Sequence, residues 1–261
     1  MRPVTDIPII DRTCRLLPGE LYFLVGRWSG EDWLATRIAH HNALRLGGRV
    51  VVMSLEQARS RTLEGLAAIE ARRNVCQLRQ RDSADQAWID TAEAAVADAP
   101  ITVVGDDTAH ATAIFETYHR ARELGGIDLL VVTSLDALAS HTDCIYGSHT
   151  SVIGRVRLLK TLAEHFGAPV VVVARARRRC DQRRLLRASD IRGGARLARM
   201  ADGVILVRPD PMPRGDPMAW RYYMAADERT VRQHATSSGP SWTAVVQQHC
   251  PSDYMPGSIY F

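Results

Sequence analysis

Apolar positions are grouped into short runs separated by longer amphipathic segments. Six runs are almost continuously apolar and rich in β-branched residues, which is typical of strands covered on both faces of a sheet. They span residues 21–25, 49–54, 101–104, 129–133, 170–174 and 204–207. Helical spacing of apolar residues recurs between them, over 34–46, 59–72, 86–97, 109–124, 152–166 and 195–201. This alternation predicts an α/β fold with a mostly parallel sheet and helices on both faces.

The length of 261 residues is compatible with one α/β domain. From about Thr236 the chain is rich in Ser, Pro, Gly and aromatic residues. We therefore expect a domain over residues 1–235 and a C-terminal tail or arm over residues 236–261.

The cysteine content gives an indication of the cellular compartment, whereas the net charge gives little indication of the binding partner. The net charge of +4 indicates little about partners, and the five cysteines form no CxxC pair, which fits a reducing cytosol. No signal peptide is visible and no run approaches the ~20 apolar residues that span a bilayer. We expect a cytoplasmic protein without a membrane partner. Among 33 basic residues, Lys160 is the only lysine.

The stretch VGRWSGEDW, residues 25–33, lies between a predicted strand and a predicted helix. A phosphate-binding loop has this setting, but it reads G-x-x-x-x-G-K-[ST]. Without a gap, Glu31, Asp32 and Trp33 replace Gly, Lys and Thr; with a one-residue gap after Ser29, Glu31 and Asp32 replace Lys and Thr. Carboxylates at a helix start complement the helix dipole. They would occupy the place of a phosphate and repel a triphosphate.

Five motifs carry a family resemblance. They are LLPGELYFLVGR (16–27), VVVMSLE (50–56), GGIDLLVV (125–132), RLLKTLAEHFGAPVVVVA (157–174) and ASDIRGGARLARMADGVILVRPD (188–210). Their order and spacing resemble the RecA-like motor domain of DnaB-type hexameric replicative helicases over about residues 10–235. The resemblance implies a RecA-like P-loop-type fold, a ring of protomers, ATP with Mg²⁺, and DNA unwinding.

The resemblance also assigns roles to individual residues. Glu56 matches the glutamate that polarises the attacking water, and Arg229 matches the arginine finger; these are the candidate catalytic residues. The nucleotide site would comprise Gly26, Arg27, Ser29, Gly30, Glu31, Asp32 and Thr133. Thr133 stands where the family has a strand-end Asp, and Arg175 replaces a glutamine that senses the γ-phosphate. These departures predict a degenerate site with weak or lost ATPase activity and no cofactor. ATP and Mg²⁺ are expected only in the alternative of an active ATP-dependent DNA helicase.

A basic segment precedes the Ser189–Asp190 pair. Its candidate nucleic-acid-binding residues are Arg175, Arg177, Arg178, Arg179, Arg183, Arg184 and Arg187. In the family this region faces the channel of the ring, and the arginine fork pairs well with phosphate oxygens. We expect single-stranded nucleic acid or another polyanion as the partner. The alternative is a solvated charge run, or one that pairs with acids of a neighbouring protein.

No metal site is expected. His141, Cys144 and His149 form H-x2-C-x4-H, which lacks a fourth zinc ligand. The sequence thus favours a non-catalytic protein that binds nucleic acid or a related protomer, in a homo- or hetero-oligomer with a DnaB-like protein. Its setting would be DNA replication or plasmid or phage DNA metabolism. The alternatives are the active helicase and a regulatory protein that keeps only the fold.

Overall fold

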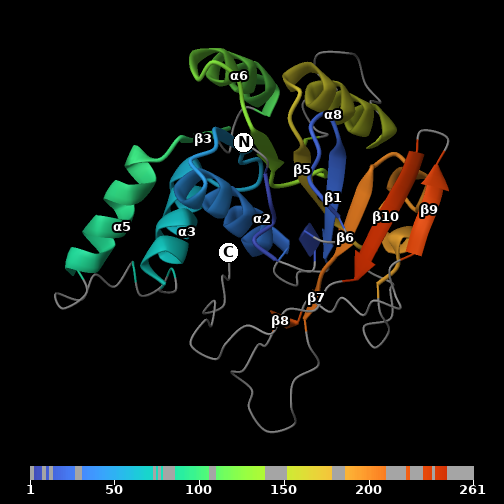
Figure 1. The fold of residues 1–261 in the computed structure, drawn as a ribbon, viewed down its shortest axis with the longest axis horizontal. Helices are drawn as coiled ribbons and strands as arrows, with labels where there is room; N and C mark the ends of the chain where they lie inside the picture. Colours follow the sequence, from blue (N-terminus) through green and yellow to red (C-terminus); the bar gives the residue numbers. More distant parts are fainter. Residues whose placement is uncertain are drawn as a thin grey trace, which may run out of the picture.

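A computed structural model describes most of the chain. The described residues are 3–7, 10–11, 14–26, 31–72, 75, 78, 86–105, 110–138, 152–177, 186–209, 222–223, 232–236 and 239–245. Their central feature is an eight-stranded sheet in the order β3-β2-β4-β5-β1-β6-β10-β9 (Figure 1). Because the order is not sequential, helices cross over between parallel neighbours, as the alternating sequence pattern predicts.

Six consecutive strands of this sheet are mutually parallel. They are β1 (Leu21–Gly26), β2 (Val50–Met53), β3 (Ile101–Val104), β4 (Leu129–Val132), β5 (Val170–Arg175) and β6 (Gly203–Leu206). At the β6 edge, β10 (Gly239–Val245) pairs in parallel with β6, and β9 (Arg232–Thr236) pairs antiparallel with β10. A separate short pair joins β7 (Arg208–Pro209) to β8 (Tyr222–Tyr223).

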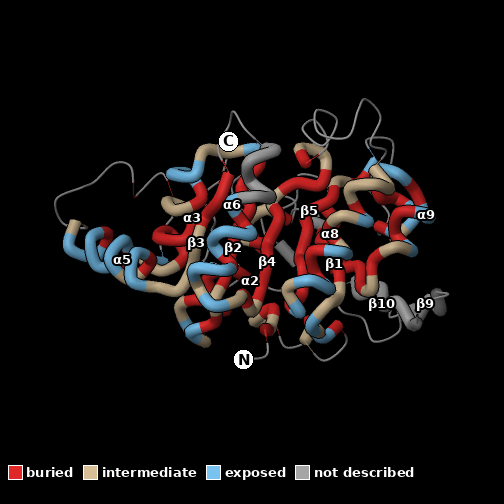
Figure 2. The backbone as a smooth tube through the Cα atoms, turned by 90° about the horizontal axis from the view of Figure 1, so that it is seen from above, coloured by how far each residue is buried: buried red, intermediate tan, exposed pale blue. Residues whose placement is uncertain are grey.

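Helices cover both faces of the sheet, so two hydrophobic layers form. The helical elements are α2 (Glu31–His40), a π-helix η1 (His41–Arg45), α3 (Arg59–Ala71), α5 (Gln86–Asp98), α6 (His110–Glu123), α8 (Val152–Phe166), a 3-10 turn η2 (Ala188–Asp190) and α9 (Ala195–Ala198). Tyr22 and Leu24 of β1 belong to the layer that includes buried residues of α2, α3 and α5, whereas Phe23 and Val25 belong to the layer that includes those of α6, α8 and α9. Figure 2 shows the buried strands β1, β2, β4 and β5 among these helices.

The six predicted strands and the α/β fold with a mostly parallel sheet are confirmed. The first helix differs, because it begins at Glu31 rather than residue 34 and changes to π geometry at His41. The last helix ends at Ala198, short of residue 201. Residues 239–245 lie in the stretch expected to be a tail or arm, and they extend the sheet as β10. The domain boundary after residue 235 stays a prediction.

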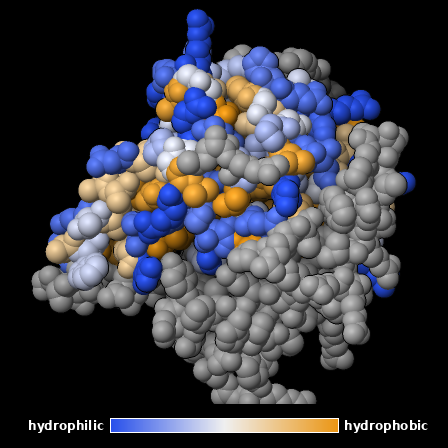
Figure 3. Space-filling model, viewed as in Figure 1, coloured by the Kyte–Doolittle hydropathy of each residue, from blue (hydrophilic) through white to orange (hydrophobic). Residues whose placement is uncertain are grey.

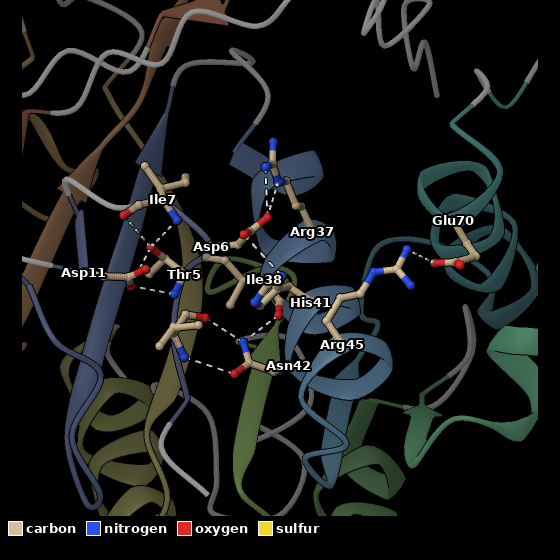
Figure 4. A network of polar contacts seen from close by, with 11 residues as sticks. Thr5, Asp6, Ile7, Asp11, Arg37, Ile38, His41, Asn42, Arg45 and Glu70 are labelled. Carbon is tan, nitrogen blue, oxygen red and sulfur yellow. Dashed lines mark hydrogen bonds and ion pairs between the residues drawn. The ribbon is translucent and has the colours of Figure 1, made fainter.

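The N-terminal segment is fixed to the side of α2 and η1 by polar contacts (Figure 4). The Asn42 side chain accepts from the Val4 N–H at 3.0 Å and donates to the Val4 carbonyl at 2.6 Å. Asp6 pairs with Arg37 at 2.9 Å and with His41 at 3.2 Å. These contacts hold the helix whose first residues enter the candidate site.

The described surface is mixed in character. On the face shown in Figure 3, hydrophilic and hydrophobic residues are interspersed wherever the structure describes them. Among the described helices, none combines the length and the apolar character needed to cross a membrane.

The parallel register places the carboxyl ends of β1, β2, β4 and β5 at one edge of the sheet. In open α/β sheets, ligands bind at this edge. The candidate site residues that follow these strands therefore come together there.

Candidate nucleotide and nucleic-acid sites

Two acids, Glu31 and Asp32, form the first turn of α2, beyond the end of β1. Glu31 is only 2% exposed. The pKa of Asp32 is raised to about 7, first by burial and then by the charges of Glu31 and Glu56, while Arg175 opposes the shift. A carboxylate at a helix start is stabilised by the helix dipole. Here burial and the neighbouring acids outweigh that effect, and they favour the neutral form of Asp32.

Glu56 lies just beyond β2, and both of its carboxylate oxygens accept from side chains of neighbouring strands. The Ser134 hydroxyl donates to Oε1 at 2.8 Å, and the Arg175 guanidinium donates to Oε2. Ser134 is buried, and Arg175 and Glu56 are 25% and 30% exposed. We call Glu31, Asp32, Glu56 and Arg175 the acidic site. Its one arginine pairs with Glu56 within the same chain.

Thr133 follows β4, in the place where the family resemblance predicts a metal-ordering acid. Its hydroxyl accepts from the Leu55 N–H at 3.0 Å and lies 3.3 Å from the Met53 carbonyl, to which it donates. The side chain thus ties the ends of β2 and β4 together. Asp128 lies before β4, at the opposite edge of the sheet, and it pairs with Arg49 at 3.0 Å, which lowers the pKa of Asp128.

The only lysine of the chain is remote from the acidic site. Lys160 of α8 pairs with Asp202, whose carboxylate also accepts from the Leu21 N–H at 2.8 Å. Leu21 begins β1, whereas Gly26 ends it, so this pair lies at the amino end of the strand. Five steps of about 3.3 Å separate the two ends by roughly 17 Å. Lys160 therefore cannot reach the start of α2.

Exposed arginines lie beside the acidic site, along the continuation of β5. The Arg177 N–H donates to the Asp190 carbonyl and the Arg192 N–H to the Arg175 carbonyl, both at 2.8 Å, around a bridge between Ala176 and Ile191. This backbone pairing extends β5 and places the backbones of Arg177 and Arg192 next to that strand. We call the described, exposed arginines from Arg177 to Arg199 the arginine surface. It consists of Arg177, Arg187, Arg192, Arg196 and Arg199. Arg175 belongs to the acidic site instead.

One acid faces the arginine surface. Asp136 pairs with Arg192 at 3.0 Å, with side chains that are 24% and 69% exposed, respectively. Asp136 follows Ser134 in the turn after β4, and the Arg192 backbone contacts Arg175. The contacts from Glu56 through Ser134, Asp136, Arg192 and Arg175 therefore form a closed ring that connects the acidic site to the arginine surface.

Several predicted site residues lie outside the described residues. They are Arg27, Ser29, Gly30, Arg178, Arg179, Arg183, Arg184 and Arg229, together with His141, Cys144 and His149 of the rejected metal pattern. Within the part of the chain that the structure describes, no group of three or more His, Cys, Asp or Glu side chains could hold a metal ion. The roles predicted for these residues stay predictions.

Comparisons with known proteins identify the family. The model of the DnaB-like helicase C-terminal domain matches residues 5–233, which is most of the chain. The chain belongs to this family. No curated protein matches the sequence. The DnaB-like assignment made from the five motifs is thus confirmed.

Solved structures support the RecA-like fold of this DnaB-like domain. One of them, described as an ATPase domain, superimposes with a TM-score of 0.69 at 18% identity, covering 85% of this chain and 82% of that one. A DnaB-like replicative helicase, solved to show its interactions with primase, superimposes with a TM-score of 0.63 at 17% identity. That alignment covers 80% of this chain and 52% of the helicase.

Sequence reasoning on this DnaB-like domain listed Glu56 as catalytic and Arg175 as nucleic-acid-binding, with Arg175 also in the place of a γ-phosphate-sensing glutamine. It missed the contact of Ser134 with Glu56 and the Asp136–Arg192 pair. The structure brings all five together because β2, β4 and β5 are neighbours. A signal was present for Glu56, Ser134 and Arg175, since each follows a predicted strand within two residues. The sequence pattern does not give the strand order that is needed to bring these residues together.

Proposed function

We propose that this chain is a non-catalytic DnaB-like domain that binds single-stranded nucleic acid in DNA replication or in plasmid or phage DNA metabolism. The observation that carries the proposal is the state of Glu56, whose two carboxylate oxygens both accept from side chains of the same chain. A general base must face the water that it activates. Here Ser134 and Arg175 hold the carboxylate instead.

The start of α2 supports the same conclusion. Phosphates bind at helix starts because the backbone N–H groups and the dipole favour an anion. Glu31 and Asp32 already place two carboxyl groups there, and the first is almost fully buried. An incoming triphosphate would meet like charge, and the chain has no lysine near enough to offset it.

The arginine surface supports the nucleic-acid part of the proposal. Its side chains are exposed, so a phosphate backbone can pair with them at little desolvation cost. Binding would be sequence-tolerant and strongly dependent on salt, because release of counterions supplies most of the affinity.

Calorimetry with MgATP and a phosphate-release assay test the loss of catalysis. We expect the wild-type chain to show neither binding at low millimolar ATP nor turnover. The ungapped restoration Glu31→Gly, Asp32→Lys and Trp33→Thr supplies the missing lysine and hydroxyl and should bind at least ~10²-fold more tightly, the size of a strong charge-assisted contact or two. Asp32→Asn is the matched control, since it removes the acid without adding a cation.

The alternatives make different predictions in the same assays. Micromolar MgATP binding by the wild type, with turnover that disappears in Glu56→Gln, would establish the active helicase. A chain that binds neither nucleotide nor single-stranded DNA at low salt would favour a regulatory protein or assembly with a related protomer.

A further inference from the structure

Arg192 is the most exposed member of the ion pairs among the described residues, at 69%, yet an acid of the same chain contacts it. Asp136 comes from a different strand end, 56 residues earlier in sequence. A phosphate approaching Arg192 would lie within a few ångströms of this carboxylate. We infer that Asp136 is an affinity-determining residue that competes with nucleic-acid phosphate for Arg192; the inference rests on the proposed binding function.

Asp136 is held in place by its own turn. The Ala137 N–H donates to the Ser134 hydroxyl at 3.1 Å, and the Leu135 N–H donates to the Val173 carbonyl at 2.8 Å. This anchors both residues next to Asp136 to the carboxyl edge of the sheet. The backbone that carries the competing carboxylate is therefore fixed, which reduces the cost of placing that carboxylate beside Arg192.

The backbone that carries Arg192 is also anchored. Its N–H donates to the Arg175 carbonyl at 2.8 Å, and the Gly194 N–H closes the next turn onto the Ile191 carbonyl at the same distance. With both backbones fixed, the pair persists more than a typical pair of mobile surface side chains. Asp136 thus reduces the positive charge that the arginine surface offers to a polyanion.

The same geometry connects the two regions of the molecule. Ser134, two residues before Asp136, donates to Glu56, and Arg175, whose carbonyl anchors Arg192, also donates to Glu56. A phosphate that displaces Asp136 from Arg192 acts on a turn that contacts the acidic site. Asp136 is therefore the point at which nucleic-acid binding reaches the former nucleotide site.

The test compares Asp136→Asn with the wild type by fluorescence anisotropy, using a labelled oligo(dT) over a series of salt concentrations. We expect about two- to five-fold tighter binding at low salt, the range of one exposed ion pair. The log–log salt slope should become steeper by about 0.7, which corresponds to one additional phosphate contact on a single strand. Asp136→Glu keeps the charge and should bind close to the wild-type level.

Glu123→Gln is the matched control. Glu123 pairs with Arg120 at 2.6 Å on α6, and both side chains are exposed. This substitution releases an arginine and raises the net charge by the same amount, but away from the arginine surface. The double variant Asp136→Asn with Arg192→Ala should bind as weakly as Arg192→Ala alone, because the gain acts through Arg192.

The outcomes separate the inference from the proposed function. If the wild type binds oligo(dT) but Asp136→Asn gains no more than Glu123→Gln, the competition is wrong and nucleic-acid binding stands. If only Asp136→Asn binds, the competition is supported in its strongest form. If neither binds at low salt, both the proposed function and the inference fail. Thermal melting checks folding, and Asp136→Ser provides a second neutral variant.

Discussion

The acidic site and the start of the arginine surface, at Arg177 and Arg192, lie at the same edge of the sheet, and their charged groups differ in burial and pairing. The acidic site places Glu31 and Asp32 in or near the core and satisfies Glu56 from within. The residues of the arginine surface are exposed, and the acid Asp136 pairs with one of them, Arg192. A polyanion therefore meets repulsion at the first region and available donors at the second.

Only one residue separates Arg175 of the acidic site from Arg177 of the arginine surface. Arg175 ends β5 and turns its side chain to Glu56, whereas Arg177, two residues later, is exposed. A Cβ atom on Gly194 would lie 2.5 Å from Nη2 of Arg177, so that guanidinium rests against the turn before α9. Because the regular strand ends between these two residues, arginines that are close in sequence belong to different regions of the surface.

The largest expected effect comes from removing charge on the arginine surface. Replacing Arg177, Arg187, Arg196 and Arg199, the members of the arginine surface other than Arg192, with Ala should weaken oligo(dT) binding on the order of 100-fold at low salt, at about 0.7 kcal/mol for each exposed charge. The log–log salt slope should fall by about 3, since each lost phosphate contact contributes about 0.7. Fluorescence anisotropy measures both quantities.

The control for this variant removes equal charge elsewhere. Arg61, Arg120, Arg122 and Arg157 are also exposed, on α3, α6 and α8, and replacing them should leave the slope near the wild-type value. Equal losses in the two variants would mean that net charge alone governs binding. A variant of the arginine surface that unfolds would indicate that these arginines stabilise the fold.

The fold was predictable from sequence to a greater extent than the site. Strands buried on both faces, such as β1 and β5, leave continuous apolar runs that periodicity detects. β9 and β10 mix polar and apolar residues at the sheet edge, so residues 239–245 were assigned to a tail. The π geometry of η1 has no separate apolar pattern, because the helical spacing continues through it.

The contacts of the site depend on strand order, which periodicity does not encode. Glu56, Ser134 and Arg175 follow or end β2, β4 and β5, which are neighbours in space but are separated by long segments of sequence. The family resemblance gave Glu56 and Arg175 separate roles toward a nucleotide and indicated no contact between them. Pairing Glu56 with Arg175 required the folded sheet.

The second prediction concerns the cost of ionising Asp32 in the acidic site. Its ordinary pKa is 3.8, and the folded value is about 7. Between these values the folded chain binds more protons than the unfolded chain, so the free energy of unfolding decreases as pH rises from about 4 to 7. Asp32→Asn should remove this dependence and be more stable than the wild type by about 2 kcal/mol at pH 8, below the full effect of the shift because some water reaches the group.

Urea unfolding of both proteins from pH 4 to pH 8 measures this difference. Asp128 contributes the opposite trend, since its lowered pKa makes stability fall at acidic pH. That contribution is present in both proteins and cancels in the comparison. Parallel stability curves would show that Asp32 ionises as it does in the unfolded chain, and would contradict the buried acidic site.

The smallest expected effect comes from breaking the ion pair between Arg175 and Glu56. Arg175→Gln removes the cation next to Glu56 and Asp32, and Glu56→Gln removes the acid that pairs with Arg175. Because Arg175 and Glu56 are 25% and 30% exposed, we expect each change to lower the free energy of unfolding by about 1 kcal/mol. The double variant should lose less than the sum, with a coupling of about 0.5–1 kcal/mol.

Arg175→Gln should also raise the pKa of Asp32 further, because the opposing charge is gone, whereas Glu56→Gln should lower it. Urea unfolding gives the coupling, and NMR titration of the Asp32 carboxyl gives the pKa; if both variants moved that pKa in the same direction, the electrostatic account of the acidic site would be wrong.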